Sequence, residues 1–459
     1  MRFAAPRARV RLTIASAALA TLAGCTDRQP EPTGIPRSLA SSRTVTGTTV
    51  TVTNTADAGS GSLRDAIGNA ADGATIVFDP TIAGQTITLT SGEILIHSSL
   101  TIAGPSTNGV TISGGGHSHV FQIQGPLVDG VVTMRNLTIT GGYTDGQAGG
   151  IEHDNMTLVL EYVLIKGNYG GHYGGGIFSS GPLVVTNSTI AGNTAFQGGG
   201  IMNTRDMSLN NVTIVGNNAP TRGGGVYVSN MFQDNLRADI HNSIIAGNTS
   251  PNGPNCSQDL PYSVTGTNIA DDLSCGPPGP NMIVADPMLG ALADNAGPTK
   301  TMAVLRGSPA IDAATDCTVT DDQRHVARPL GAACDIGAYE FDNYVKTTLS
   351  VDASVVVNPN TGTAAVTGAF GCSEPASVLL HVTLSEPQKV GKVPAVVAAT
   401  DSIPLTCTSG SKAWSVALTP PTGAFSNGNG TVTVNTDHES AYVLPQSASA
   451  SVKLYWGHK

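Results

Sequence analysis

Acidic, basic and histidine side chains follow two glycine-rich segments of this chain. Glu152, His153 and Asp154 come after the first, and Arg205 and Asp206 come after a later one. Glycoside hydrolases use two carboxylates held about 5 Å or about 6.5–9.5 Å apart, and a lyase would need a basic residue and carboxylates for calcium. These five residues are therefore a candidate catalytic cluster. The alternative is that they are solvated turn residues.

A second set of side chains precedes the glycine runs. Its members are Tyr143, Tyr169, His172, Tyr173, Phe196 and Arg222. The whole chain has only 2 Trp, 10 Tyr and 9 Phe, so this concentration of aromatic residues is informative. Exposed rings with a polar rim suit stacking on sugars or contact with a protein. We predict a ligand-binding edge whose partner is an extracellular polysaccharide or a surface protein. The alternative is that the rings only shield nearby backbone.

Patterns typical of metal ligands are incomplete. His117 and His119 form a pair without an evident third ligand. The acidic pairs at 271–272 and 321–322 do not follow a calcium-loop pattern. We predict no cofactor and no metal site, with calcium as the alternative.

Both candidate sets lie in a repeating region. An Ile-x-Gly-Asn motif starts at Ile165, Ile190, Ile214 and Ile245, and a Gly-Gly-Ile/Val motif starts at Gly149, Gly175, Gly199 and Gly224. Both have a period of about 25 residues, typical of stacked repeats. Each period holds short β-branched runs separated by Gly/Asn turns, as in one coil of a β-helix. The repeat predicts an all-β fold, a right-handed parallel β-helix over residues 49–343. The spacing of a leucine-rich repeat is missing.

Stacking the coils assigns roles to these residues. The motif isoleucines would form an interior column, because equivalent positions on neighbouring coils lie about 4.8 Å apart. Two columns of asparagine would occupy corners, where Asn tolerates left-handed backbone and can hydrogen-bond along the column. They are Asn168, Asn193, Asn217 and Asn248 at one corner, and Asn136, Asn187, Asn211 and Asn242 at another. The aromatic set would line one edge, whereas Asp154 and Asp206 would be on the order of 10 Å apart.

The two ends of the repeat region have their own patterns. Residues 62–70 predict one short amphipathic helix, capped by Ser62, that would cover the first coil and block edge pairing. Residues 345–456 alternate apolar and polar residues in about seven runs, which predicts a small immunoglobulin-like β-sandwich.

The N-terminus reads as a targeting segment. Residues 1–25 begin with several arginines and continue with an apolar run too short to span a bilayer, which needs about 20 residues. The sequence Leu-Ala-Gly before Cys25 resembles a bacterial lipobox, which implies a lipid on Cys25. Thr26 in place of an acidic residue favours the outer membrane. Residues 26–48 read as a flexible tether.

Cysteine spacing and charge agree with export. Besides Cys25, six cysteines fall into three local pairs, which favours disulfides in an oxidising compartment over metal binding. The pairs are Cys256 with Cys275, Cys317 with Cys334, and Cys372 with Cys407. The formal net charge of −10 argues against nucleic acid or an anionic membrane surface as a partner. Membrane contact would come only through the lipid, and we expect a monomer.

Three segments resemble known families of exported β-helix proteins. Thr53-Asn54-Thr55 with Gly61-Ser-Leu-Arg-Asp-Ala-Ile67 resembles the CSLREA cap, although Gly61 replaces the name-giving cysteine. The repeat motifs resemble relaxed polymorphic outer-membrane-protein repeats. Gly307-Ser-Pro-Ala-Ile-Asp312, Arg328-Pro329 and Asp335-Ile-Gly-Ala-Tyr-Glu340 resemble a choice-of-anchor Q domain, over about residues 282–343.

These observations favour a non-enzymatic surface protein of a Gram-negative-type bacterium, a rigid rod for adhesion or glycan recognition. A polysaccharide lyase or glycoside hydrolase on the same scaffold is one alternative. A structural spacer that presents the terminal sandwich is the other.

Overall fold

The computed structural model describes residues 47–125, 130–231, 236–259, 263–390, 392–438 and 442–457. The predicted signal peptide, with Cys25, and nearly all of the predicted tether lie outside these ranges. Within them, no helix is long and apolar enough to cross a membrane.

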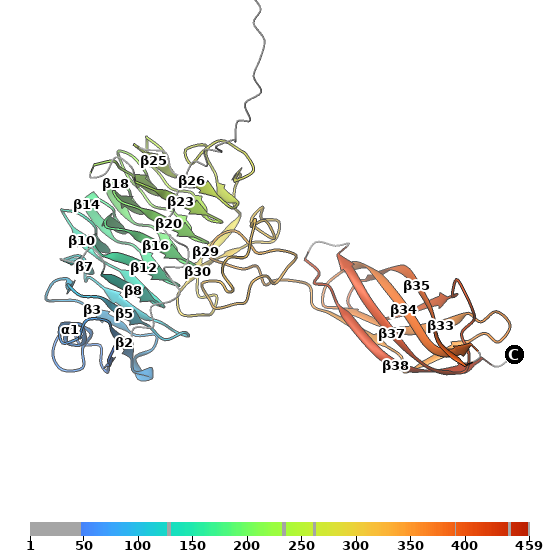
Figure 1. Cartoon of the computed structure of the whole chain (residues 1–459). Helices are drawn as coiled ribbons and strands as arrows, with labels where there is room; N and C mark the ends of the chain where they lie inside the picture. Colours follow the sequence, from blue (N-terminus) through green and yellow to red (C-terminus); the bar gives the residue numbers. More distant parts are fainter. Residues whose placement is uncertain are drawn as a thin grey trace, which may run out of the picture.

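Residues 49–284 form a parallel β-helix, and this part of the predicted fold is confirmed (Figure 1). Three long parallel sheets, named here A, B and C, run along the coil stack. Sheet A contains β1 (Thr49–Val52), β2 (Ala74–Phe78), β5 (Leu100–Ala103), β8 (Val131–Arg135), β12 (Thr157–Glu161), β16 (Leu183–Thr186), β20 (Met207–Asn210), β23 (Ala238–His241) and β26 (Ser263–Thr265). Sheet B contains β3 (Thr86–Thr88), β6 (Val110–Ser113), β9 (Leu137–Thr140), β13 (Leu164–Lys166), β17 (Thr189–Ala191), β21 (Thr213–Val215), β24 (Ile244–Ala246), β27 (Asn268–Ala270) and β28 (Met282–Val284).

Sheet C and a short fourth sheet complete the coils. Sheet C contains β4 (Ile94–Ile96), β7 (Phe121–Gln124), β11 (Ile151–Asp154), β15 (Ile177–Ser180), β19 (Ile201–Asn203), β22 (Val226–Val228) and β25 (Cys256–Gln258). The fourth sheet, D, contains β10 (Tyr143–Thr144), β14 (Tyr169–Tyr173) and β18 (Thr194–Gln197). Sheet D lies between sheets B and C in chain order, so it makes an extra edge on the middle coils.

The interior is an apolar column built by the repeat. Ile165 pairs with Ile190, Ile190 with Ile214, and Ile214 with Ile245, and all four are almost completely buried. Because neighbouring coils stack these side chains directly over one another, each coil buries its apolar face only with the next. The predicted isoleucine column is confirmed.

Both predicted asparagine columns are also present. In the first column, the Oδ1 of Asn193 accepts hydrogen bonds from the backbone N–H and Nδ2 of Asn168. The residues of the second column, Asn136, Asn187, Asn211 and Asn242, all have positive φ, between 45° and 58°. Asparagine suits both corners because its amide can bond along the stack and it tolerates left-handed backbone.

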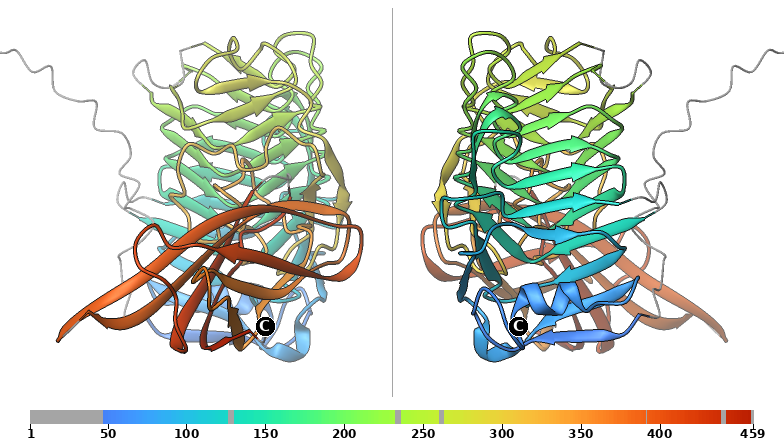
Figure 2. Two further views of the ribbon diagram at one scale, coloured as in Figure 1. Left: turned by 90° about the vertical axis from the view of Figure 1, so that its right-hand side faces the viewer. Right: turned by 90° about the vertical axis from the view of Figure 1, so that its left-hand side faces the viewer.

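One short helix closes the first coil. Helix α1 (Leu63–Gly68) lies at the N-terminal end of the stack (Figure 2), and its Leu63, Ala66 and Ile67 are buried. Ser62 caps it by accepting a hydrogen bond from the backbone N–H of Asp65. A 3-10 turn, η2 (Pro80–Ile82), follows β2. The predicted cap is confirmed, with a slightly shorter helix than expected.

After β28 the chain leaves the coils and runs along their side as an irregular segment, which we name the strap (residues 285–344). Its only strands are the antiparallel pair β29 (Leu289–Ala293) and β30 (Thr301–Val304). The strap bonds to the second asparagine column: Asn187 donates to the carbonyl of Asp321 at 2.9 Å, and Asn242 to that of Asp316 at 3.1 Å. The chain segment that resembles the anchor Q domain therefore lies against several coils rather than over the last one.

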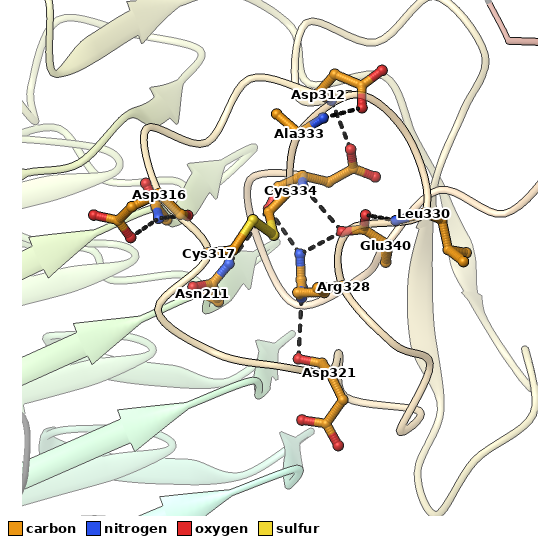
Figure 3. The surroundings of a disulfide bond; sticks show 12 residues. Asn211, Asp312, Asp316, Cys317, Asp321, Arg328, Leu330, Ala333, Cys334 and Glu340 are labelled. Carbon is orange, nitrogen blue, oxygen red and sulfur yellow. Dashed lines mark hydrogen bonds and ion pairs between the residues drawn. A yellow bond between two sulfur atoms is a disulfide. The ribbon is translucent and has the colours of Figure 1, made fainter. Parts of the chain in front are cut away.

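A buried ion pair organises the strap (Figure 3). Arg328 Nη1 lies 2.9 Å from Glu340 Oε2, and both side chains are completely buried. Arg328 also donates to the carbonyls of Asp335 and Gly337. The disulfide Cys317–Cys334 joins two turns of the same segment. These contacts fold the strap on itself while its outer loops bind the coils.

Residues 347–456 form a separate, mainly antiparallel β-unit (Figure 1). The predicted second all-β unit is confirmed, but it has eight strands connected in one sheet rather than about seven. Its strands are β31 (Thr347–Val351), β32 (Ser354–Val357), β33 (Ala364–Cys372), β34 (Ala376–Val390), β35 (Val393–Cys407), β36 (Gly410–Leu418), β37 (Gly428–His438) and β38 (Ser447–Trp456). Alternate residues such as Val366, Leu380 and Leu454 enclose a core of their own. The salt bridge Arg306–Glu374, at 3.0 Å, connects this unit to the strap.

All three predicted disulfides are formed. Cys256–Cys275 lies near the last coils, Cys317–Cys334 in the strap, and Cys372–Cys407 joins β33 to β35. Each bond joins the pair of cysteines that are neighbours in the sequence.

Candidate functional site

Two tyrosines of the predicted binding edge are stacked on sheet D. Tyr143 of β10 and Tyr169 of β14 are register partners, and their ring centroids are 4.9 Å apart with an interplanar angle of 14°. Tyr143 is 44% exposed and Tyr169 39% exposed. The stacking follows from the coil spacing, because equivalent side chains on neighbouring coils are about as far apart as two stacked rings.

One face of this pair is left without a third ring. The partner of Tyr169 on the following coil is Thr194, and the partner of Thr194 beyond it is Asn218. Phe196 lies two residues after Thr194 on β18 and is 49% exposed. Alternation places Thr194 and Phe196 on the same side of their strand. We name Tyr143, Tyr169, Thr194 and Phe196 the aromatic edge.

The other members of the predicted set are not part of this edge, although His172 and Tyr173 lie on β14 as well. Tyr173 is half-buried, and its ring packs on Phe178 with centroids 5.9 Å apart. His172 is exposed. Arg222 is held by Asp259 at 3.1 Å and by the ring of Tyr227. The structure thus exposes Tyr143, Tyr169 and Phe196 on sheet D, packs Tyr173 against Phe178, and ties the partly exposed Arg222 to Asp259.

A small apolar cluster outside the coils explains that packing. Phe178, Met202 and Tyr227 occupy the outer side of sheet C in successive coils, yet all are buried. Ala148, which precedes β11, and Tyr173 at the end of β14 pack against them. The outward register of Phe178, Met202 and Tyr227 suggests a solvent-facing column, and these covering residues help to bury it.

The predicted catalytic residues on β11 are divided by strand alternation. His153 points into the coil interior and is completely buried, whereas Glu152 and Asp154 lie on the outer side. His153 Nε2 donates to the carbonyl of Met156 at 2.5 Å, and Nδ1 is 2.9 Å from Ser179 Oγ. Burial lowers the pKa of His153 to about 4. This histidine is a neutral interior residue that does not face the two carboxylates.

Arg205 and Asp206 lie in the turn between β19 and β20. The Asp206 carboxylate accepts a hydrogen bond from the backbone N–H of Arg237 at 2.8 Å. The backbone carbonyl of Asp206 accepts one from the N–H of Leu183. On the next coil the register partner of Asp154 is Ser180, and on the coil after that the equivalent position is Thr204. Asp206 is therefore offset along the coil from the column that contains Asp154.

The sequence patterns did not indicate one contact of Glu152. Its Oε2 lies 3.3 Å from Nε2 of His119, which belongs to the preceding coil. The Nδ1 of His119 bonds to the carbonyl of Ala148. Burial raises the pKa of Glu152, and the neighbouring Asp154 and Glu93 act in the same direction, while His119 opposes them. Glu152 is thus a partly buried carboxyl group with an acidic neighbour on its own strand.

The acidic residues considered as metal ligands bond to the protein. Asp271 accepts the N–H of Gly247 and Nδ2 of Asn255, and Asp321 accepts the hydroxyl of Tyr162. Among the residues that the structure describes, no group of three or more His, Cys, Asp or Glu side chains is placed to hold a metal ion.

Sequence patterns also did not indicate a hydrogen-bonded row in the C-terminal unit. His381 on β34 is 2.6 Å from Ser402 Oγ on β35 and 2.6 Å from Asp437 Oδ2 on β37. These side chains come from three adjacent strands and lie on an exposed sheet face. No run of these residues in the sequence could have indicated the contact.

Comparisons with known proteins do not identify a family. No family model matches this sequence, and no curated protein matches it. A β-glucosidase from Listeria innocua in complex with glucose shares 14% identity over 28% of this chain and 19% of its own, with a TM-score of 0.18. A sporulation control protein from Bacillus subtilis shares 12% identity over 26% of this chain and 51% of its own, with a TM-score of 0.17. At such low TM-scores these likenesses carry no argument.

Proposed function

We propose that this protein is an exported, non-enzymatic surface rod that recognises glycans through the aromatic edge. The carrying observation is the stacked and exposed pair Tyr143 and Tyr169, 4.9 Å apart. A sugar ring presents an apolar face and a rim of hydroxyls, which matches an aromatic ring flanked by polar groups. The exposed Tyr169, with its register partner Thr194 and the exposed Phe196 on the following coil, offers both kinds of contact.

The rod supports this proposal because it holds the edge rigidly. Tyr143 and Tyr169 are placed by in-register strands on coils that share one continuous core. The protein would then need little ordering when it binds a ligand. Ordering of side chains and loops costs binding free energy, so a rigid edge favours higher affinity. We further propose that a lipid on Cys25 tethers the rod to the outer membrane, and that the three family resemblances reflect this class of exported proteins.

The aromatic edge is tested by the double variant Tyr143→Ala with Tyr169→Ala on a glycan array. The matched control is Tyr455→Ala, an exposed tyrosine on β38. Loss of roughly tenfold or more in affinity for the glycans bound by the wild type, with unchanged folding and an unaffected control, supports the proposal. Unchanged binding in the double variant refutes recognition through this edge, whereas absence of glycan binding by the wild type favours the spacer alternative.

Lipid attachment is tested separately. Cells expressing the full chain or its Cys25→Ser variant are labelled with a radioactive fatty acid. Label on the first and not on the second supports a lipid on Cys25, and the absence of label from both contradicts it.

Hydrolysis of a polysaccharide is a second candidate function, favoured by Glu152 and Asp154. They lie two residues apart on one side of β11, with their Cα atoms about 7 Å apart, so both carboxyl groups are on the same surface of the coil, as a glycosidase requires. The raised pKa of Glu152 would suit a general acid. Release of reducing ends by the wild type and not by Glu152→Gln would support this candidate, and absence of products from the wild type on the array's glycans would exclude it.

A further inference from the structure

A cavity lies between the strap and the outer side of sheet B. Its volume is ≈ 400 Å³, at the lower end of the range for small-ligand sites. The floor is formed by β6, β9 and β13 with Thr138, Thr140 and Lys166, and the wall is formed by strap residues 294–300. Because the wall comes from a segment far away in the sequence, the cavity exists only in the folded protein.

The cavity lining is rich in cations and hydroxyl groups. Lys166 and Lys300 both line it, and no hydrogen bond or ion pair ties either ammonium group to a described residue. One carboxylate, Asp294, also lines it and accepts the backbone N–H of Ala296 at 3.1 Å. Two ammonium groups against one carboxylate leave a local positive charge in a chain whose formal net charge is −10. Such a site favours an anionic group whose remaining oxygens can bond to threonine hydroxyls.

The cavity is next to the aromatic edge. Thr140 pairs with Lys166 across two coils, and Tyr143 pairs with Tyr169 across the same two coils. Two residues separate Thr140 from Tyr143 in one coil and Lys166 from Tyr169 in the next. The Cα atoms of Lys166 and Tyr169 are therefore at most about 11 Å apart. The turn between them contains Gly167, whose φ is 61°, and the inward-pointing Asn168. Lys166 and Tyr169 therefore face outward on either side of one corner.

We infer that the ligand of the aromatic edge is an acidic glycan, whose carboxylate or sulfate group enters the cavity and is bound by Lys166 and Lys300. This inference rests on the proposed glycan recognition and adds the chemical class of the ligand. A ring stacked on Tyr169 would place a neighbouring charged group at the mouth of the cavity, because the two sites share a corner of the coil.

The test compares three probes with one backbone: dextran, carboxymethyl-dextran and dextran sulfate. The full-length wild type is compared with Lys166→Met/Lys300→Met in low salt and in high salt. The matched control is Lys412→Met/Lys453→Met, which removes two exposed lysines from the C-terminal unit. We expect the wild type and the control to bind one or both charged polymers roughly tenfold more tightly than dextran, and the Lys166/Lys300 variant to lose that preference. The preference should also weaken in high salt.

A second readout locates the contact. Lysine acetylation followed by mass spectrometry should show that the preferred polymer protects Lys166 and Lys300 but not Lys412. Preference for only carboxymethyl-dextran, or for only dextran sulfate, identifies the anionic group. Equal binding of all three polymers by the wild type, or a preference that survives the Lys166/Lys300 substitutions, overturns the inference.

The tyrosine variant separates the two proposals. If Tyr143→Ala/Tyr169→Ala still shows lysine protection with undiminished affinity, the aromatic edge is not the sugar-binding surface, and the glycan proposal at that edge fails while the anion site stands. If the tyrosine variant weakens binding but the lysine variant does not, the edge stands and the acidic-glycan inference fails.

Discussion

Asn193 donates two hydrogen bonds to one atom of Asn217, its counterpart on the next coil. The backbone N–H of Asn193 lies 2.9 Å from Oδ1 of Asn217, and Nδ2 of Asn193 lies 3.0 Å from the same oxygen. Asn217 repeats the pattern toward Asn248, and each Nδ2 also donates to a carbonyl of the preceding coil. Each of these buried side chains thus accepts a backbone N–H from the preceding coil and donates its own amide N–H to the asparagine of the next coil.

Replacement of Asn217 by alanine should destabilise the coil stack strongly. It removes the side-chain partner of two N–H donors of Asn193, and both residues are completely buried. An unsatisfied buried donor costs about 1–3 kcal/mol, so we expect a loss of about 3 kcal/mol or more in the free energy of unfolding. Asn218→Ala, in the same turn but exposed, is the matched control and should change stability little. Equal effects of the two substitutions in chemical denaturation would contradict this role.

His153 should make the β-helix less stable in mild acid. Its folded pKa is about 4, below the ordinary value of 6.5, because burial penalises the charged form. As pH falls below about 6.5, the unfolded chain binds a proton that the folded protein cannot, so stability is present above that pH and lost toward pH 4. From about pH 7 to about pH 5 the loss should be about 2 kcal/mol.

The measurement is the difference in unfolding free energy between these two pH values for the wild type and His153→Gln. We expect a smaller difference in the variant. His172→Gln, which changes an exposed histidine, should keep the wild-type dependence. A variant of His153 with the full wild-type dependence would show that other groups cause the acid sensitivity.

Arg328→Met should detach the strap without unfolding the coils. The substitution leaves Glu340 buried without its cationic partner and removes the hydrogen bonds that Arg328 donates to the carbonyls of Asp335 and Gly337. Breaking a buried pair by removing one partner costs about 3–5 kcal/mol. Limited proteolysis should then cut within residues 305–342 much faster, while the circular dichroism of the β-helix is retained. Arg306→Met, which breaks an exposed pair with Glu374, should not accelerate this cleavage.

The disulfide Cys372–Cys407 should stabilise the C-terminal unit and leave the coils unaffected. It closes a loop with a sequence separation of 35 residues, which corresponds to about 3–4 kcal/mol in the chain-entropy model. Replacing both cysteines by serine should lower the free energy of unfolding of residues 347–456 by that amount, measured as a shift of this unit's transition in chemical denaturation. A change in the transition of the β-helix instead would mean that the two units unfold together.

Sequence alone determined the parts of the fold that depend on local pattern. A motif that recurs at a nearly constant spacing can bury its isoleucines only by stacking, so the interior column and the asparagine columns could be read directly. The Ser62 cap and the apolar face after it are equally local. Strand alternation from the inward-facing Ile151 also indicates that His153 points inward. The position of His153 after a glycine run suggested a surface site instead.

Tertiary structure decided where the exposed surfaces and the cavity lie. Tyr143, Tyr169 and Phe196 are all in the predicted set, but periodicity did not distinguish them from Tyr173, which packs against Phe178. Lys166 acquires Lys300 as a neighbour only because the strap returns along sheet B, and Glu152 acquires His119 only through coil stacking. Contacts between segments so distant in the chain depend on how loops and strap fold over the coils, and no repeating pattern in the sequence encodes that path.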